Sequence, residues 1–237
     1  MSLNSDLIKA QSEIKWFFKD YEIYSVSSNQ IKLTVEFSSM YPLLSKLIEK
    51  SRITEFMMNN ENYRIYGWDT IESNTCGWVC KINDVNTKIE LRQEHKLLTS
   101  IVGGIKETWD EKDEIEITDA LTINQNFLFI PSLCEKGIGF NREYYLELCT
   151  EKGYMPLTDF DNLVRFAQEA NGNMTLYNPD NGKLYLFCYD HDFNYVTPIN
   201  NQPEYTFYYL NGCENFVSYV EKIAEDWLKI IPATARL

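Results

Sequence analysis

The run Leu184-Tyr185-Leu186-Phe187-Cys188-Tyr189 decides the expected fold, because six consecutive apolar or aromatic residues are typical of a strand buried on both faces. The turn signal Pro179-Asp180-Asn181-Gly182 lies shortly before it. We therefore expect residues 174–177, on the other side of this turn, to pair with the run as the first strand of a hairpin.

The segments around this hairpin predict one helix before it, and a strand and a helix after it. Residues 158–170 carry apolar side chains at helical spacing, with Thr158 as the expected N-cap and Gly172 as the residue that ends the helix. Residues 205–209 alternate as a third strand, and a long amphipathic helix capped from Asn211 is expected to follow. This order predicts an α+β fold, with a mixed, largely antiparallel sheet and helices packed mainly on one side.

The chain before this segment also predicts helices and strands. The clearest half-buried strand is 31–37, where apolar and polar residues alternate. Four more strands are expected, over 63–68, 77–82, 88–91 and 127–130, and four more helices, over 6–18, 42–57, 94–102 and 141–151. Strand-rich sequence gives way to helix and glycine near Glu94. A boundary there would divide the chain into an N-terminal α+β region, 1–93, and a second domain, 94–237; a single continuous core is the alternative.

Bulk composition limits the class of partner. The chain has 237 residues and a net charge of −13, which disfavours nucleic acid and anionic membrane surfaces because both attract clustered Lys and Arg. No apolar run approaches the roughly 20 residues that cross a bilayer, and residues 1–10 do not form a signal peptide. The six cysteines lack the density of a disulfide scaffold. We expect reduced thiols and a cytoplasmic location.

The negative charge is concentrated in residues 107–119, which contain seven acidic residues and a single lysine, Lys112. One interpretation is a solvated acidic loop, and the other is a docking surface for a basic protein. The acidic residues of this run are Glu107, Asp110, Glu111, Asp113, Glu114, Glu116 and Asp119.

Exposed aromatic side chains are a second candidate contact. Aromatic residues at 205–209 fall on both faces of the expected strand, so Tyr208 would be exposed if Phe207 is buried. Tyrosine is favoured at interfaces because it buries a large area with few rotatable bonds. A sheet that is packed on both faces is the alternative.

Asp190-His191-Asp192 places a histidine between two carboxylates, a composition suited to a metal site or a proton shuttle. A metal site needs three or four ligands, and the other histidine, His95, lies about a hundred residues away. The structural interpretation is that the two aspartates order the loop after the strand. The metal site is therefore the alternative, and we expect no cofactor.

Other catalytic patterns are weak. Cys76 and Cys80 do not have Cys-x-x-Cys spacing and are expected to be buried free thiols. Gly103-Gly104 has no P-loop lysine, and no serine stands in a nucleophile elbow. With two histidines in the chain, nucleophilic catalysis with a histidine base is not indicated.

Four segments together resemble the SUKH superfamily, which includes cell-wall assembly regulators and bacterial immunity proteins. Residues 95–105 (HKLLTSIVGGI) are similar to its helix that ends in a Gly-Gly step, and 127–139 resemble its strand and glycine-containing loop. Residues 184–192 resemble its apolar strand with an acidic end, and 216–220 its terminal helix. The resemblance covers roughly 94–228, with 141–170 as a helical elaboration. It implies an α+β fold and a non-catalytic protein that neutralises a toxin by binding it.

We therefore expect a non-catalytic, cytoplasmic protein-binding module, interpreted as an immunity protein whose acidic surface covers a basic toxin, which the resemblance suggests is a nuclease. Two other classes remain open. One is a metal-dependent hydrolase centred on Asp190, His191 and Asp192. The other is a structural protein that forms a homodimer through a sheet edge; the sequence leaves the oligomeric state open.

Overall fold

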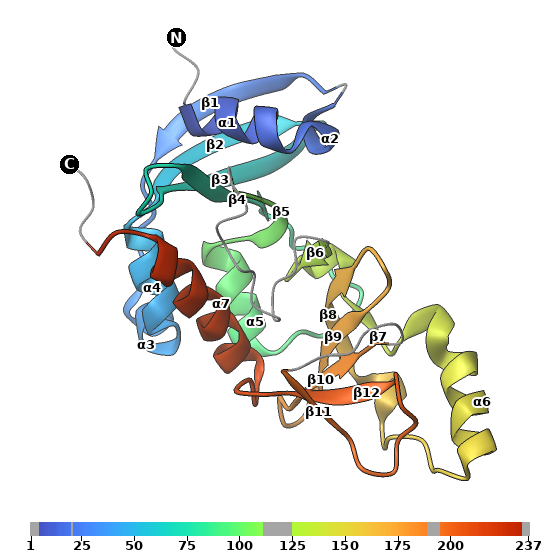
Figure 1. Cartoon of the computed structure of the whole chain (residues 1–237). Coiled ribbons are helices and arrows are strands. Elements are labelled where there is room, and N and C mark those ends of the chain that lie inside the picture. The colour runs from blue at the N-terminus through green and yellow to red at the C-terminus, as the bar shows by residue number, and fades with distance from the viewer. Residues whose placement is uncertain (1–4, 20, 111–124, 189–194, 234–237) are drawn as a thin grey trace.

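The computed structural model describes residues 5–19, 21–110, 125–188 and 195–233. In these residues the chain forms an α+β fold around a twelve-stranded sheet (Figure 1). The strand order is β1-β2-β3-β4-β5-β6-β8-β9-β10-β12-β11, with β7 paired to β8. Every pairing in it is antiparallel. The expected fold class is confirmed.

The first half of the sheet is a meander of long strands. Its members are β1 (Ile23–Asn29), β2 (Arg52–Met58), β3 (Glu61–Asp69), β4 (Thr75–Ile82) and β5 (Gly104–Asp110). Strand β3 pairs with β4 over eight residue pairs. This run of consecutive neighbours is the simplest antiparallel topology, since each connection joins adjacent strands.

The second half is built from shorter strands. Its members are β6 (Gln125–Leu128), β7 (Glu135–Lys136), β8 (Val164–Glu169), β9 (Met174–Tyr177), β10 (Leu184–Phe187), β11 (Val196–Pro198) and β12 (Phe207–Leu210). Strands β8, β9 and β10 form a meander, and β12 inserts between β10 and the edge strand β11. Single 3-10 turns lie at Pro131–Leu133, Gly139–Asn141 and Phe160–Asn162.

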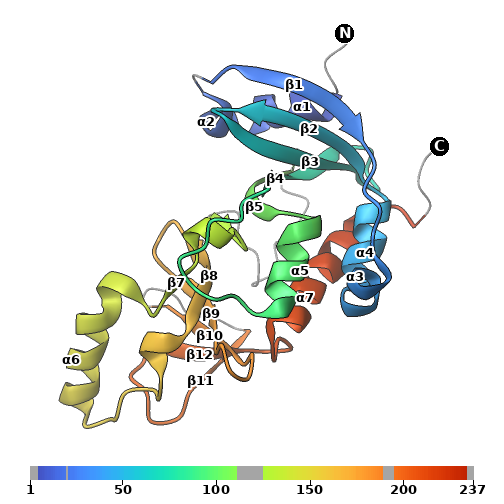
Figure 2. The same cartoon turned by 180° about the vertical axis from the view of Figure 1, so that it is seen from behind.

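Helices cover both faces of the sheet, with more of them on one face. The larger core is formed with α3 (Val35–Met40), α4 (Pro42–Glu49), α5 (Gln93–Ile101) and α7 (Phe216–Ile230). On the opposite face, α1 (Ser5–Glu13) and α2 (Lys15–Phe18) cover the first half. There α6 (Arg142–Lys152) covers the second half. Figures 1 and 2 show α5 and α7 between the two halves, with α6 at the far end of the molecule.

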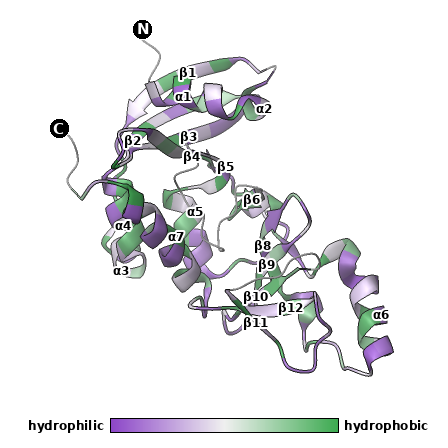
Figure 3. Ribbon diagram, in the orientation of Figure 1, coloured by the Kyte–Doolittle hydropathy of each residue, from purple (hydrophilic) through white to green (hydrophobic). Residues whose placement is uncertain are grey.

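Side chains alternate between the two faces of a strand, so one sheet contributes residues to the cores on both of its faces. In β3, Tyr66 and Trp68 enter the larger core, whereas Tyr63 and Ile65 face α1 and α2. Gly77 in β4 is required by this packing, because a Cβ there would lie 2.0 Å from the Trp109 ring. In Figure 3 the α7 ribbon carries both hydrophilic and hydrophobic residues, as expected of a helix with one buried face.

The larger core includes residues from both sides of the predicted boundary near Glu94, from Phe37 to Ile231. The backbone ladder between β4 and β5 also crosses that position. The boundary itself remains a prediction. Among the described helices, none combines the length and hydropathy that a membrane span requires.

Several predicted elements are confirmed. The hairpin of β9 and β10, the strands β3, β4, β6 and β12, and the helices α5, α6 and α7 form close to their expected positions. The expected N-terminal helix forms as α1 and α2, with Leu7, Ile14 and Phe18 buried. Strong local periodicity predicts these elements because each buries one face.

The helix predicted over 158–170 is wrong, since residues 164–169 form strand β8. Leu163 enters the core beneath α6 while Val164 and Phe166 enter the larger core, so side chains alternate from Leu163 to Phe166. A register shift between Arg165 and Ala167 then places Ala167 in the larger core as well. Backbone partners on both sides, β6 and β9, favour the strand over the local helical spacing. The predicted elaboration over 141–170 is therefore helical mainly in α6 and in one short turn.

The predicted strand 31–37 is also wrong. Thr34 caps α3 by accepting a hydrogen bond from the Phe37 backbone N–H at 3.1 Å, and the strand lies earlier, at β1. The helix predicted over 42–57 ends at Glu49, and β2 follows. No strand forms at 88–91, while Gly104 opens strand β5.

The predicted cap of the final helix is also wrong. Asn215, not Asn211, accepts from the Ser218 backbone N–H, and the Ser218 hydroxyl accepts from the Asn215 backbone N–H.

Candidate functional site

The structure places the beginning of the acidic run on strand β5. Glu107 and Asp110 are half-buried there. The other predicted contact residues of the run lie outside the described residues; they are Glu111, Asp113, Glu114, Glu116 and Asp119. The described part of the site therefore consists of the β5 carboxylates and the side chains that cover them.

An exposed tryptophan lies near the Glu107 carboxylate. Phe17 and Phe18 anchor the short helix α2, with Phe17 edge-on to Tyr63 at 5.4 Å between ring centroids. The neighbouring Trp16 is 66% exposed, and its side chain lies near enough to the Glu107 carboxylate to help lower the pKa of that group. A large aromatic surface and an acceptor for a cation therefore lie side by side.

Burial perturbs the Glu107 carboxyl. Partial burial raises its pKa, while the positive charge of Lys106 and the nearby Trp16 side chain act in the opposite direction. Burial disfavours the charged form of a carboxyl group, and a positively charged partner stabilises that form. An Arg or Lys side chain that approached Trp16 would supply that charge and could also stack on the indole face.

The expectation that Tyr208 is exposed is wrong, because the residue is 9% exposed and belongs to the larger core. Strand β12 lies between β10 and β11, so Phe207 is buried on one face and Tyr208 on the other. The Tyr208 hydroxyl accepts from the Tyr205 backbone N–H at 2.8 Å. The sheet is packed on both faces here, which was the alternative interpretation.

Asp190, His191 and Asp192 lie outside the described residues, so the predicted metal site stays a prediction. Within the described ranges, no group of three or more His, Cys, Asp or Glu side chains could hold a metal ion. Cys76 and Cys80 are buried free thiols, as predicted, and burial raises the Cys80 pKa far above its ordinary value.

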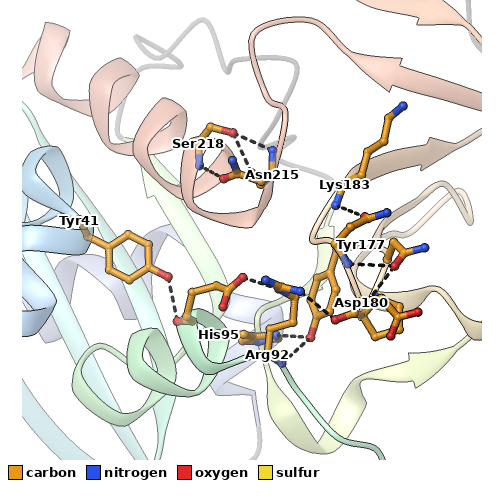
Figure 4. Close-up of polar contacts among 12 residues, drawn as sticks. Tyr41, Arg92, His95, Tyr177, Asp180, Lys183, Asn215 and Ser218 are labelled. Atoms are coloured by element: carbon orange, nitrogen blue, oxygen red, sulfur yellow. Dashed lines mark hydrogen bonds and ion pairs between the residues drawn. The ribbon is translucent and has the colours of Figure 1, made fainter.

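The second histidine, His95, is fully buried at the junction of the two halves (Figure 4). Its Nε2 lies 3.0 Å from the Phe129 carbonyl oxygen, and its Nδ1 lies 3.4 Å from the Tyr177 hydroxyl. Because a carbonyl can only accept, Nε2 carries the proton and Nδ1 accepts from Tyr177. The imidazole also stacks on Phe216 at 4.7 Å between ring centroids.

This histidine is structural. Burial lowers the His95 pKa to about 4, with the Phe129 carbonyl and Glu94 opposing the shift. The ring is therefore neutral near pH 7 and has no contact with solvent. It cannot exchange a proton with a bound substrate in this arrangement, but it links α5 to β9 and to α7.

Comparisons of the chain with models of known families, with characterised proteins and with solved structures give no match. The resemblance to the SUKH superfamily therefore remains a prediction from the sequence.

The sequence interpretation did not include Trp16, although a signal was present. The apolar stripe of the N-terminal segment runs through Leu7, Ile14, Phe17 and Phe18, and Trp16 lies off it. A tryptophan off the buried stripe is a candidate for contact with another molecule. Its proximity to Glu107 required the tertiary structure.

Proposed function

We propose that the chain is a non-catalytic module that binds a basic protein through Trp16 and Glu107. The observation that carries the proposal is the exposed indole of Trp16 beside the half-buried Glu107 carboxylate, at the start of the acidic run. Tryptophan is among the residues that contribute most to protein interfaces, and an adjacent carboxylate selects a cationic side chain.

Long-range charge supports the same partner. The residues that follow Asp110 in sequence, 111–119, add five acidic residues and one lysine, and the whole chain carries a net charge of −13. Such a charge attracts a basic protein and accelerates encounter at low ionic strength. The indole and the Glu107 carboxylate would then determine the bound orientation.

In its finer form, the proposal is that the partner is a toxin and the chain is a cytoplasmic immunity protein. The support for this form is the sequence resemblance to the SUKH superfamily together with the acidic charge. A toxin that acts on nucleic acid would offer a basic substrate groove, which an acidic surface can cover.

The test compares matched variants of the immobilised full chain in lysate of the source cell. Trp16→Ala and Glu107→Lys alter the proposed surface, with Glu107→Gln as a milder change. Tyr144→Ala and Glu147→Lys alter exposed positions on α6 and serve as controls. Bound proteins are quantified by mass spectrometry at low and high salt, and the candidate is then purified and titrated against all variants.

We expect a basic protein to be retained by the wild type and by both α6 controls. Trp16→Ala should weaken its binding by about thirtyfold, as for a contact worth about 2 kcal/mol. High salt should weaken binding to the wild type more than binding to Glu107→Gln. A partner that binds Trp16→Ala and Glu107→Lys as tightly as the wild type would refute the proposed surface.

A further inference from the structure

The outer face of α6 carries an exposed apolar stripe. It consists of Phe140, in the turn that leads into the helix, and of Tyr144 and Leu148, which follow at intervals of four residues. Phe140 is 74% exposed and Tyr144 is 47% exposed. Leu148 is half-buried and, among the described residues, does not belong to the core beneath α6. Aromatic surface is therefore presented to solvent along one side of this helix.

An acidic stripe lies beside the apolar one. Glu143, Glu147 and Glu151 also follow one another at intervals of four residues, and all three are exposed. Like charges at this spacing repel one another along a helix. Within the described residues, neither Glu147 nor Glu151 forms an ion pair, and Arg142 of the same helix is paired with Asp161 at 2.8 Å. Cations from another molecule would relieve the repulsion.

The opposite side of α6 is anchored, so the two stripes are presented on a fixed helix. Tyr145 is fully buried and packs edge-on against Phe160 and Phe207, at 5.0 and 5.1 Å between ring centroids. Its hydroxyl accepts from the Leu157 backbone N–H at 2.7 Å. Gly153 ends the helix in the left-handed conformation, with a φ of 69°. The outer face therefore has its geometry before any partner binds.

The acidic stripe restricts which molecule can cover this face. A second copy of the chain, bound through the same face about a twofold axis, would bring the acidic stripes of both copies together, which is unfavourable. Anionic membranes and nucleic acid are disfavoured for the same reason. A protein segment with cations opposite the glutamates and apolar side chains opposite Phe140 and Tyr144 is complementary to both stripes.

We propose that the outer face of α6 binds a basic amphipathic helix of another protein. Its apolar residues would pack on Phe140, Tyr144 and Leu148, while lysines or arginines along one edge would pair with the glutamates. A helix fits because both stripes repeat every four residues, so the ridges of a second helix can pack along them. Figures 1 and 2 show α6 far from α2, the helix of Trp16, so this proposal does not rest on the Trp16 surface.

The test uses a synthetic peptide of about 18 residues, long enough to form a helix, with leucines on one helical face and lysines on the other. Its control has the same composition in scrambled order, and therefore the same charge without an apolar face. Binding of each fluorescent peptide to the full chain is measured by anisotropy. We expect a dissociation constant of roughly 10 µM for the patterned peptide and binding about tenfold weaker for the scrambled one.

Matched variants locate the contact. Tyr144→Ala and Glu147→Lys should each weaken the patterned peptide about tenfold. Trp16→Ala removes an exposed aromatic in the other half of the molecule, and Glu72→Lys changes the net charge as Glu147→Lys does, at an exposed position before β4. Both should bind the peptide as the wild type does. The comparison of the two lysine variants separates local pairing from long-range attraction.

Three results would overturn the proposal. Equal binding of the two peptides would show that charge alone explains the attraction. Binding to Tyr144→Ala and Glu147→Lys as tight as to the wild type would exclude α6 as the contact. Loss of binding in Trp16→Ala, with Tyr144→Ala unaffected, would place the peptide at the Trp16 surface instead.

Discussion

The two halves of the sheet use the same larger core but are held together differently. In the first half, β3 pairs with β4 over eight residue pairs and with β2 over seven. In the second half, β10 pairs with β12 over two and with β9 over four. The shorter ladders supply fewer backbone hydrogen bonds, so the second half depends more on side-chain packing.

The junction supplies much of that packing. Phe216, at the start of α7, contacts His95, Phe129, Phe166 and Tyr177, with the Phe166 ring centroid 5.1 Å away. The other end of the same helix packs on the first half, where Trp227 lies 5.2 Å from Trp78 between ring centroids. One helix therefore stabilises each half through a different aromatic residue, and substitutions at its two ends test the comparison.

Trp227→Ala and Phe216→Ala should have the largest effects, each reducing the free energy of unfolding by about 3–5 kcal/mol because both side chains are almost fully buried. Urea unfolding measures the totals. Hydrogen exchange should show lost protection mainly in β3 and β4 for Trp227→Ala, and in β8 and β9 for Phe216→Ala. Equal loss across the whole sheet for both variants would mean that the halves unfold as one unit.

His95→Gln should change the pH dependence of stability. The folded-state pKa of His95 is lowered to about 4, so the unfolded state binds more protons between pH 6.5 and 4. Stability from the neutral ring is present above pH 6.5 and is lost as the pH falls. We expect this group to remove about 2 kcal/mol between pH 7 and 5 in the wild type and nothing in the variant.

The measurement for His95 is urea unfolding of both proteins at a series of pH values. His95→Gln will also lower stability at pH 7, so the slope with pH is the informative quantity. An unchanged slope in the variant would show that His95 is not neutral and buried in the folded protein.

The N-termini of α4 and α7 are capped in different ways, and removing either cap should lower the stability of the protein by a similar amount. Glu221 of α7 accepts from the Leu43 and Leu44 backbone N–H groups of α4 at 2.8 and 3.0 Å, across 178 and 177 residues of the chain. Asn215 caps its own helix locally. Glu221→Ala and Asn215→Ala should each reduce the free energy of unfolding by about 1 kcal/mol, measured by thermal or urea unfolding.

The location of the loss should differ between these two variants. Glu221→Ala should expose the α4 amides to exchange in the first half, whereas Asn215→Ala should expose those at the start of α7. Loss of protection in the same segment for both would contradict separate capping.

Glu107→Gln and Glu61→Gln should have the smallest effects on the free energy of unfolding. The two substitutions should change its pH dependence in opposite directions. Burial raises the Glu107 pKa, so its stability contribution is present at low pH and is lost as the pH rises through the folded pKa. The Glu61 pKa is lowered because hydrogen bonds from Lys81 and Tyr63 outweigh the effect of burial, so its contribution is lost as the pH falls. Unfolding between pH 3 and 7, a range of roughly two units around the ordinary pKa, should show a flatter decline on acidification for Glu61→Gln and a steeper one for Glu107→Gln.

The difference between local signals and contacts of distant segments explains which elements could be predicted from the sequence. The hairpin of β9 and β10 was predicted correctly, because an apolar run and the turn at Pro179–Gly182 act within a few residues. Strand β8 was predicted as a helix, because residues 160–167 fit helical spacing and the partner β6 lies far away in the chain. Strand β1 was missed because its side chains are mostly exposed and do not alternate.

The features of the candidate sites also divide into those that the sequence predicts and those that require the tertiary structure. The acidic run and its position could be read from the sequence, since charge is a property of composition. The burial of Tyr208 and the proximity of Trp16 to Glu107 could not, because each depends on segments that are distant in the chain.

The sequence by itself determined the α+β class, the strong hairpin, the helices α5 to α7 and the acidic character, because periodicity, turn residues and charge are local properties. The tertiary structure decided which face of each strand is buried, where His95 lies and which side chains meet at the surface. It did so because burial requires a second layer, and the residues of that layer come from distant parts of the chain.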